Sequence, residues 1–225
     1  MGAESARWTM VTVDNRCFGR LTVRTRWLGP DDDLAAVLLE YCSERRPGDT
    51  IVVSEKVAAL LTGQSIPVES VRVGWEAKLL SRFIRTHHDT LGLSVPVKMA
   101  WVVQHVGRVR IFAAAAAAAV TRPFGIRGTF YRLAGDPARQ IDGGSPPHAD
   151  LLFPPLDGED AGAICDEMEA KLGVGVAIAD INDFGGSIRG VSKAALPKGI
   201  LADVLADNPM RQKATGTPFA IVRPA

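Results

Sequence analysis

The sequence has few cysteines and no marked excess of either charge. Its 225 residues include three cysteines, Cys17, Cys42 and Cys165, which are far apart and lack CxxC spacing. This pattern argues against a disulfide framework or a zinc knuckle and favours a reducing cytoplasm. The net charge is +1, from 26 Lys and Arg against 25 Asp and Glu. We therefore expect no nucleic-acid partner and no binding to an anionic membrane.

Long apolar runs and several common catalytic motifs are also missing. The longest apolar candidate, residues 111–120, contains seven consecutive alanines and is too short to span a bilayer. Residues 1–7 contain no apolar segment typical of a secretory signal, so we expect a cytoplasmic protein. The sequence has no GxxxxGK[ST] loop, no GxSxG and no HExxH. Any nucleotide site must therefore be built in another way.

Alternating strand and helix patterns predict an α/β fold, with α+β as the alternative. We expect one domain over residues 1–225, in which the loop at 142–155 could separate two lobes. Segment 91–128 is apolar and rich in small residues, which predicts a buried element at a packing or subunit interface. Predicted strands are 8–13, 18–27, 50–54, 129–133, 174–179 and 219–222. One predicted helix begins near residue 34, and three others cover residues 75–86, 158–172 and 196–205.

The acidic segment Asp180-Ile181-Asn182-Asp183 follows the strand predicted at 174–179. The carboxyl end of a strand in an α/β sheet is a common place for a site. Carboxylate and amide oxygens bind Mg²⁺ or Mn²⁺, and Gly185 and Gly186 allow backbone amides to approach an anion. An Asx-rich turn after a strand explains the same residues.

Five further residues, at four places in the chain, are weighed between a functional and a structural interpretation. Asp142 precedes Gly143-Gly144 and could complete an acidic pocket for two metals, or belong to a turn. Lys56 could neutralise a phosphate, or pair with Glu55 at the surface. His87 and His88 are adjacent, so they rarely share one metal, and a capping role suits at least one of them. Arg211 could reach an anion, or lie in a turn after a helix.

Seven stretches in this order resemble one family of enzymes. They are TRWLGPDDDL (25–34), GDTIVVSEKVAALLTGQ (48–64), THHDTLGLSVP (86–96), residues 110–132 ending in GIRGTFYR, Ile141-Asp142-Gly143, ADINDFGG (179–186) and DNPMRQKATGTP (207–218). Together they resemble the coenzyme F-420-0 gamma-glutamyl ligases, in particular their bacterial ligase-like homologues.

The resemblance implies the mixed-sheet fold of that family, a homodimer and a cytoplasmic amide ligase. ATP or GTP phosphorylates a carboxylic acid, and an amine, L-glutamate in that family, attacks the acyl phosphate with Mg²⁺ or Mn²⁺ present. No nucleic acid or membrane takes part. The implied metal ligands are Asp142, Asp180, Asn182 and Asp183, and the implied catalytic residues are Lys56, Asp180 and Asp183. The implied nucleotide or phosphate residues are Ser54, Lys56, Gln64, Gly185 and Arg211, and His88 contacts the substrate.

The sequence departs from the family pattern around the substrate pocket. Gly144 replaces the proline of IDGP, and Asp89 follows His88 where a glycine is expected. Gln64 stands where many relatives have arginine, and Arg211 stands where glycine is common. The acidic residue before the TP pair is replaced at Thr215 or Gly216. Because the metal carboxylates are kept, we expect the phosphate chemistry to be retained. Because the departures fall around the substrate pocket, the acid is either the coenzyme F-420 precursor or a carboxylic acid of secondary metabolism, and the amine could differ from L-glutamate. A non-catalytic nucleotide- or metal-binding regulator and a metal-dependent phosphohydrolase are the alternatives.

Overall fold

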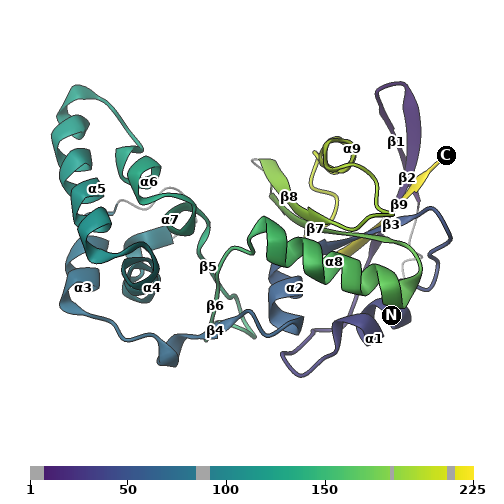
Figure 1. Cartoon of the computed structure of the whole chain (residues 1–225), viewed down its shortest axis with the longest axis horizontal. Helices are drawn as coiled ribbons and strands as arrows, with labels where there is room; N and C mark the ends of the chain where they lie inside the picture. Colours follow the sequence, from purple (N-terminus) through teal and green to yellow (C-terminus); the bar gives the residue numbers. More distant parts are fainter. Residues whose placement is uncertain (1–7, 85–91, 183–184, 212–215) are drawn as a thin grey trace. The chain divides into compact units, whose positions relative to one another are not determined.

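The computed structural model describes residues 8–84, 92–182, 185–211 and 216–225. Strands and helices together confirm the α/β class (Figure 1). The chain divides into two compact units, which are described separately. Unit 1 contains residues 1–63 and 156–225, and unit 2 contains residues 64–155. Whether they act as one domain stays a prediction.

Unit 1 is built on a six-stranded mixed sheet with the order β1-β2-β9-β3-β7-β8. Its strands are β1 (Thr9–Val13), β2 (Arg16–Val23), β3 (Thr50–Ser54), β7 (Gly175–Asn182), β8 (Gly185–Val191) and β9 (Phe219–Pro224). Strands β3 and β7 are parallel, and the other neighbours are antiparallel. All five residues of β3 are buried, as expected for a central strand that is covered on both faces.

Helices cover both faces of this sheet (Figure 1). Helix α9 (Lys198–Val204) packs on one face through Leu201 and Val204, against Val52, Ala177 and Ala179. Helix α8 (Gly158–Leu172) lies on the opposite face beside α1 (Leu34–Tyr41), and α2 (Glu55–Leu61) contacts strands β3 and β7. Because side chains alternate along a strand, Asp180 belongs to the face opposite to that of Ala177 and Ala179.

Unit 2 is mainly helical and has its own hydrophobic core. Its helices are α3 (Trp75–Ser81), α4 (Pro96–Val106), α5 (Arg108–Thr121), α6 (Thr129–Ala134) and α7 (Asp136–Gln140), with short 3-10 turns η1 (Val68–Ser70), η2 (Gly92–Ser94) and η3 (Arg122–Phe124). A small sheet has the order β4-β6-β5, from Ile66–Pro67, Leu151–Phe153 and Asp142–Gly143. Gly107, with φ +93°, separates α4 from α5. Among the described residues, no helix combines the length and apolar character needed to cross a membrane.

The structure corrects several predicted elements. Residues 129–133 form helix α6 and not a strand, because Phe130 and Ala134 pack on one helical face into the unit 2 core. Packing here overrides the strand preference of Thr, Phe and Tyr. Helix α3 ends at Ser81, earlier than predicted. Within residues 92–128, α4 buries five residues whereas α5 buries only Ile111 and Ala114. A subunit interface over this segment stays a prediction.

Candidate functional site

The candidate site lies where two neighbouring parallel strands end. Ser54, the last residue of β3, is in register with Ala179 of β7. The next residues, Glu55 and Asp180, therefore follow at the same carboxyl edge of the sheet, where α/β proteins commonly bind ligands. Asp180 lies within β7, which continues to Asn182, so Asp180-Ile181-Asn182 belongs to a strand and not to a turn.

Arg189 joins these two carboxylates. Its Nε lies 3.0 Å from Oε1 of Glu55, and its Nη2 lies 3.1 Å from Oδ2 of Asp180. The Nε contact is an ion pair without hydrogen-bond alignment, whereas Nη2 donates a hydrogen bond to Asp180. The β7–β8 register passes from Ile178–Gly190 to Ala179–Ile188. Arg189 is thus the extra residue of a β-bulge, a feature that redirects a side chain.

Glu55 is the most deeply buried carboxylate of this cluster. It is 9% exposed, at the start of α2, and its Oε1 also accepts a hydrogen bond from the Leu156 amide at 2.8 Å. Burial raises the pKa of Glu55, while the positive charge of Arg189 and the Leu156 amide oppose that rise. The nearby Asp180 carboxylate adds to the rise. The side chain of Asp180 is 44% exposed, so this carboxylate is the one that solvent can reach.

Two glycines shape the beginning of β8. At Gly186, an added Cβ would lie 2.4 Å from the Asp180 carbonyl oxygen and 2.7 Å from Ile181 Cα, so a side chain does not fit. Gly185 has φ +125° and is exposed, with open space around an added Cβ. The strand backbone can therefore pack closely beside Asp180, and the positive φ of Gly185 is a conformation that a side chain would strain.

The other predicted residues are distributed as follows. Ser54 is buried at the end of β3, and Lys56 lies partly buried in the first turn of α2, so both are at the same strand edge. Asn182 is exposed at the end of β7. Asp183 and His88, with its neighbour His87, lie outside the described residues.

Asp142 and Gln64 belong to unit 2. Asp142 is in β5, and its Oδ1 accepts a hydrogen bond from the Gly143 amide and lies 3.5 Å from Nζ of Lys98. Gln64 is exposed. The prediction that Asp142 completes an acidic pocket with Asp180 is therefore not tested by the contacts within either unit.

Arg211 lines a different part of unit 1. It borders a polar cavity of about 330 Å³, together with Thr9, Arg20, Thr22, Asp207 and Pro209. Arg20 is buried there and forms a two-pronged ion pair with Asp207, while its Nη1 also donates to the Val204 carbonyl at 2.7 Å. The Arg20 guanidinium holds the pKa of Asp207 below its usual range. Glu55, Asp180 and Arg189 do not line this cavity.

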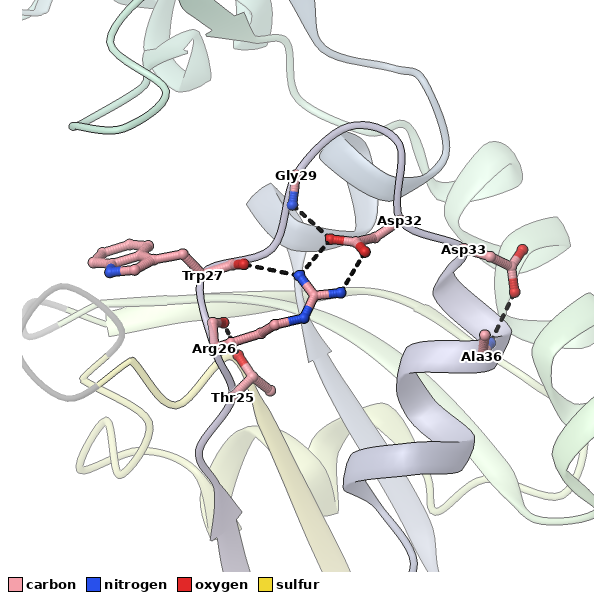
Figure 2. Close-up of polar contacts among 7 residues, drawn as sticks. All are labelled: Thr25, Arg26, Trp27, Gly29, Asp32, Asp33 and Ala36. Atoms are coloured by element: carbon pink, nitrogen blue, oxygen red, sulfur yellow. Dashed lines mark hydrogen bonds and ion pairs between the residues drawn. The ribbon is translucent and has the colours of Figure 1, made fainter. Parts of the chain in front are cut away.

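The first family-like stretch, residues 25–34, forms a loop with its own polar contacts (Figure 2). Arg26 and Asp32 form a two-pronged ion pair, with Nη1 to Oδ2 at 2.9 Å, and Asp32 also accepts from the Gly29 amide. These contacts lower the pKa of Asp32 to about 2. Asp33 caps α1 by accepting a hydrogen bond from the Ala36 amide at 2.8 Å. In this loop, Asp32 and Asp33 stabilise the backbone.

The described residues do not on their own make a site for a hard cation. No group of three or more His, Cys, Asp and Glu gathers among them, and both carboxylates of the cluster, Glu55 and Asp180, are already paired with Arg189. The sequence interpretation missed Arg189 and treated Glu55 only as a partner for Lys56. The signal for Glu55 was its place directly after a buried strand, and Arg189 had no comparable signal.

The chain was compared with known protein families and with curated proteins. No protein-family model matches the chain, and a search of curated proteins gives no match.

Proposed function

We propose that the protein is a nucleotide- and metal-dependent acid–amine ligase that works through an acyl phosphate. The carrying observation is the convergence of Glu55, Asp180 and Arg189 at one edge of the parallel pair β3–β7. Two of the family-like stretches, 48–64 and 179–186, supply that edge although more than a hundred residues separate them. Their pairing supports treating them as parts of one site.

The residues at this edge suit the binding of a charged substrate. Asp180 is solvent-accessible and is held in place by Arg189, which is itself fixed by the buried Glu55. Lys56, in the first turn of α2, brings a cation for a phosphate group to the same edge. Fixed charges aimed at the reacting groups stabilise a transition state without reorganisation. ATP or GTP is the proposed phosphoryl donor.

The proposed metal is Mg²⁺ or Mn²⁺, and its proposed ligands are Asp142, Asp180, Asn182 and Asp183. The family-like fold and the homodimer are likewise part of the proposal, which rests on the order of the seven resembling stretches. The departures at Gly144, Asp89, Gln64 and Arg211 favour an acid and an amine other than the coenzyme F-420 precursor and L-glutamate.

The test is turnover by the purified full-length protein. It is mixed with ATP or GTP, Mg²⁺ or Mn²⁺, candidate carboxylic acids and a panel of amines that includes L-glutamate. We expect nucleoside diphosphate to be released only when an acid and an amine are both present, with an amide product seen by mass spectrometry. Phosphate release without an amine would instead indicate a phosphohydrolase. Nucleotide binding by calorimetry without any turnover would indicate a regulator.

Asp180→Asn tests the assigned edge. It keeps the size of the side chain and removes its charge, so we expect the turnover number to fall by about 100-fold or more. Asp166→Asn is the matched control, because Asp166 is exposed on α8 and outside the site. Equal turnover numbers for the two variants would show that Asp180, at the carboxyl edge of β7, takes no part in the reaction.

A further inference from the structure

The polar cavity of unit 1 is distinct from the strand edge assigned to the reaction. Glu55, Asp180 and Arg189 do not line it. Its volume of about 330 Å³ falls within the range of small-ligand pockets, which begins at about 300 Å³. The lining residues are Thr9, Arg20, Thr22, Asp207, Pro209 and Arg211. The proposed reaction leaves this cavity without a role.

Three of the lining residues share one face of the β1–β2 hairpin. Arg20 and Thr22 are two residues apart in β2, and Thr9 of β1 is in register with Arg20. Because side chains alternate along a strand, all three lie on the same face as Phe18. Phe18 belongs to the core cluster that contains the buried residues of α9, whereas Asp180 is on the opposite face of the sheet. The sheet therefore separates the cavity from the Asp180 carboxylate.

Arg20 is a buried arginine whose hydrogen-bonding capacity is only partly used. Its side chain is 10% exposed. Nη1 donates to the Val204 carbonyl and to one oxygen of Asp207, and Nη2 donates to the other oxygen. A guanidinium has five N–H groups, so Nε–H and one hydrogen of Nη2 have no acceptor among the described residues. Asp207 thus fixes a planar donor group that can still bind an oxyanion in the cavity.

The lining residues carry an excess of positive charge. They include two arginines and one carboxylate, so their formal charge is +1. The pKa of Asp207 is lowered by its hydrogen bond with Arg20 and, to a smaller extent, by the charge of Arg211. All three charges are therefore close together. Because Arg20 and Asp207 neutralise each other as an ion pair, Arg211 supplies the excess charge that attracts an anion.

The loop that brings Arg211 to the cavity is anchored in the core. Met210 is fully buried and Asn208 is 6% exposed. The Thr217 hydroxyl donates to the Met210 carbonyl, and Asn208 Oδ1 accepts from the Arg211 amide at 3.4 Å. Asn208 and Arg211 have φ of +48° and +38°, a conformation that is uncommon for residues other than glycine. Packing therefore holds this backbone in a form that is frequent at ligand sites.

We propose that this cavity binds the phosphate group of a small molecule. Arg20 and Arg211 supply charged donors, and the hydroxyls of Thr9 and Thr22 supply neutral ones. Four donor groups suit the three or four oxygens of a phosphate better than the two oxygens of a carboxylate. The cavity has room for a small organic group beside the phosphate, so the class includes free phosphate and phosphate monoesters. The inference goes beyond the proposed function and assigns Arg211 to a site other than the strand edge.

Isothermal titration calorimetry of the full-length protein with sodium phosphate, without nucleotide or metal, tests the site. We expect saturable binding of one phosphate per chain. Arg211→Gln removes an exposed charge and should raise the dissociation constant at least 10-fold. Thr22→Val keeps the shape of the side chain, removes its hydroxyl and should raise the constant about 5-fold. The matched control is Arg46→Gln, because Arg46 is exposed in unit 1 and does not line the cavity; it should keep the wild-type constant.

A titration with glycerol phosphate distinguishes the two sources of the phosphate group. Tighter binding than that of free phosphate would identify a monoester as the ligand, and weaker or equal binding would identify free phosphate. The proposal is overturned if phosphate does not bind, if Arg211→Gln binds as well as the wild type, or if Arg46→Gln weakens binding as much. It is also overturned if acetate binds more tightly than phosphate. Binding that Lys56→Gln abolishes and Arg211→Gln preserves would place the phosphate at the strand edge instead.

Discussion

Removal of Arg189 should destabilise unit 1 mainly through Glu55. In Arg189→Met, Glu55 keeps only the Leu156 amide as a partner for its Oε1. The Arg189 and Glu55 side chains are each 12% exposed, so this pair is a buried one. Removing one partner of a buried ion pair costs about 3–5 kcal/mol. The Asp180 contact adds little, about 0–1 kcal/mol, because a 44%-exposed carboxylate regains water.

We therefore expect Arg189→Met to lower the free energy of unfolding by about 3 kcal/mol at neutral pH, measured by urea denaturation. The lower end of the range applies because the Leu156 amide remains and because Glu55 can take up a proton. Arg189→Lys is the matched control. It keeps the charge, but a single ammonium cannot reproduce the planar guanidinium that reaches both carboxylates, so its loss should be smaller, about 1–2 kcal/mol.

A double-mutant cycle can separate the effect of the unpaired Glu55 charge from the effect of lost side-chain packing. If the uncompensated Glu55 charge dominates, Arg189→Met should cost at least about 1 kcal/mol less in the Glu55→Gln background. Its cost should also shrink at acidic pH, where Glu55 is protonated and needs no counter-charge. A loss below about 1 kcal/mol at neutral pH, or one that is the same in both backgrounds, would refute this account of the cluster.

Three further predictions concern stability, each measured by denaturant unfolding. Because the folded state raises the pKa of Glu55, the native protein binds more protons at that group than the unfolded chain does, and the contribution of Glu55 to the free energy of unfolding falls as pH rises from the usual glutamate pKa through the folded one. The stability of Glu55→Gln relative to the wild type should therefore be higher at neutral than at acidic pH. The reverse trend would contradict the direction of this pKa shift. Gly190→Ala should cost about 1–3 kcal/mol, since its Cβ would lie 2.4 Å from the Ala161 carbonyl carbon on α8. Asp157→Ala should cost about 1 kcal/mol, because its Oδ1 accepts from the Glu159 and Asp160 amides at 2.9 and 2.8 Å, and Asp157→Asn should restore most of it.

Local signals predicted much of the sheet and its helices. The apolar run at 50–54 and the strand at 174–179 were confirmed as β3 and the main part of β7. The helix at 158–172 was confirmed, and Gly173 ends it in the left-handed conformation at φ +70°. These elements depend on periodicity and terminal residues, which are encoded within a few positions. The helix at 129–134 was missed because its packing partners lie elsewhere in the chain.

The candidate site could be predicted only in part, for a similar reason. Asp180 and Lys56 were identified because each comes soon after an apolar run that predicts a buried strand, 174–179 and 50–54. The part played by Glu55 depends on its burial and on Arg189, which is 134 positions away in sequence. The position of Arg189 in turn depends on one unpaired residue in the β7–β8 ladder. A bulge shifts register by one residue without a marked sequence pattern, so it could not be inferred from composition or spacing.

Arg189 bears directly on the proposed metal. The Arg189 guanidinium, 3.1 Å from Asp180, already places a positive charge beside this carboxylate, as a divalent cation would. Asp180 can contribute to a metal site only if its second oxygen faces the ion while Arg189 holds the first, or if Arg189 gives up its contact. In the first case the charge of Arg189 weakens metal affinity but fixes the carboxylate, so Arg189→Met would bind Mn²⁺ more tightly and yet turn over more slowly. In the second case, the metal and the Arg189–Asp180 pair exclude each other, and Glu55 alone must retain the arginine.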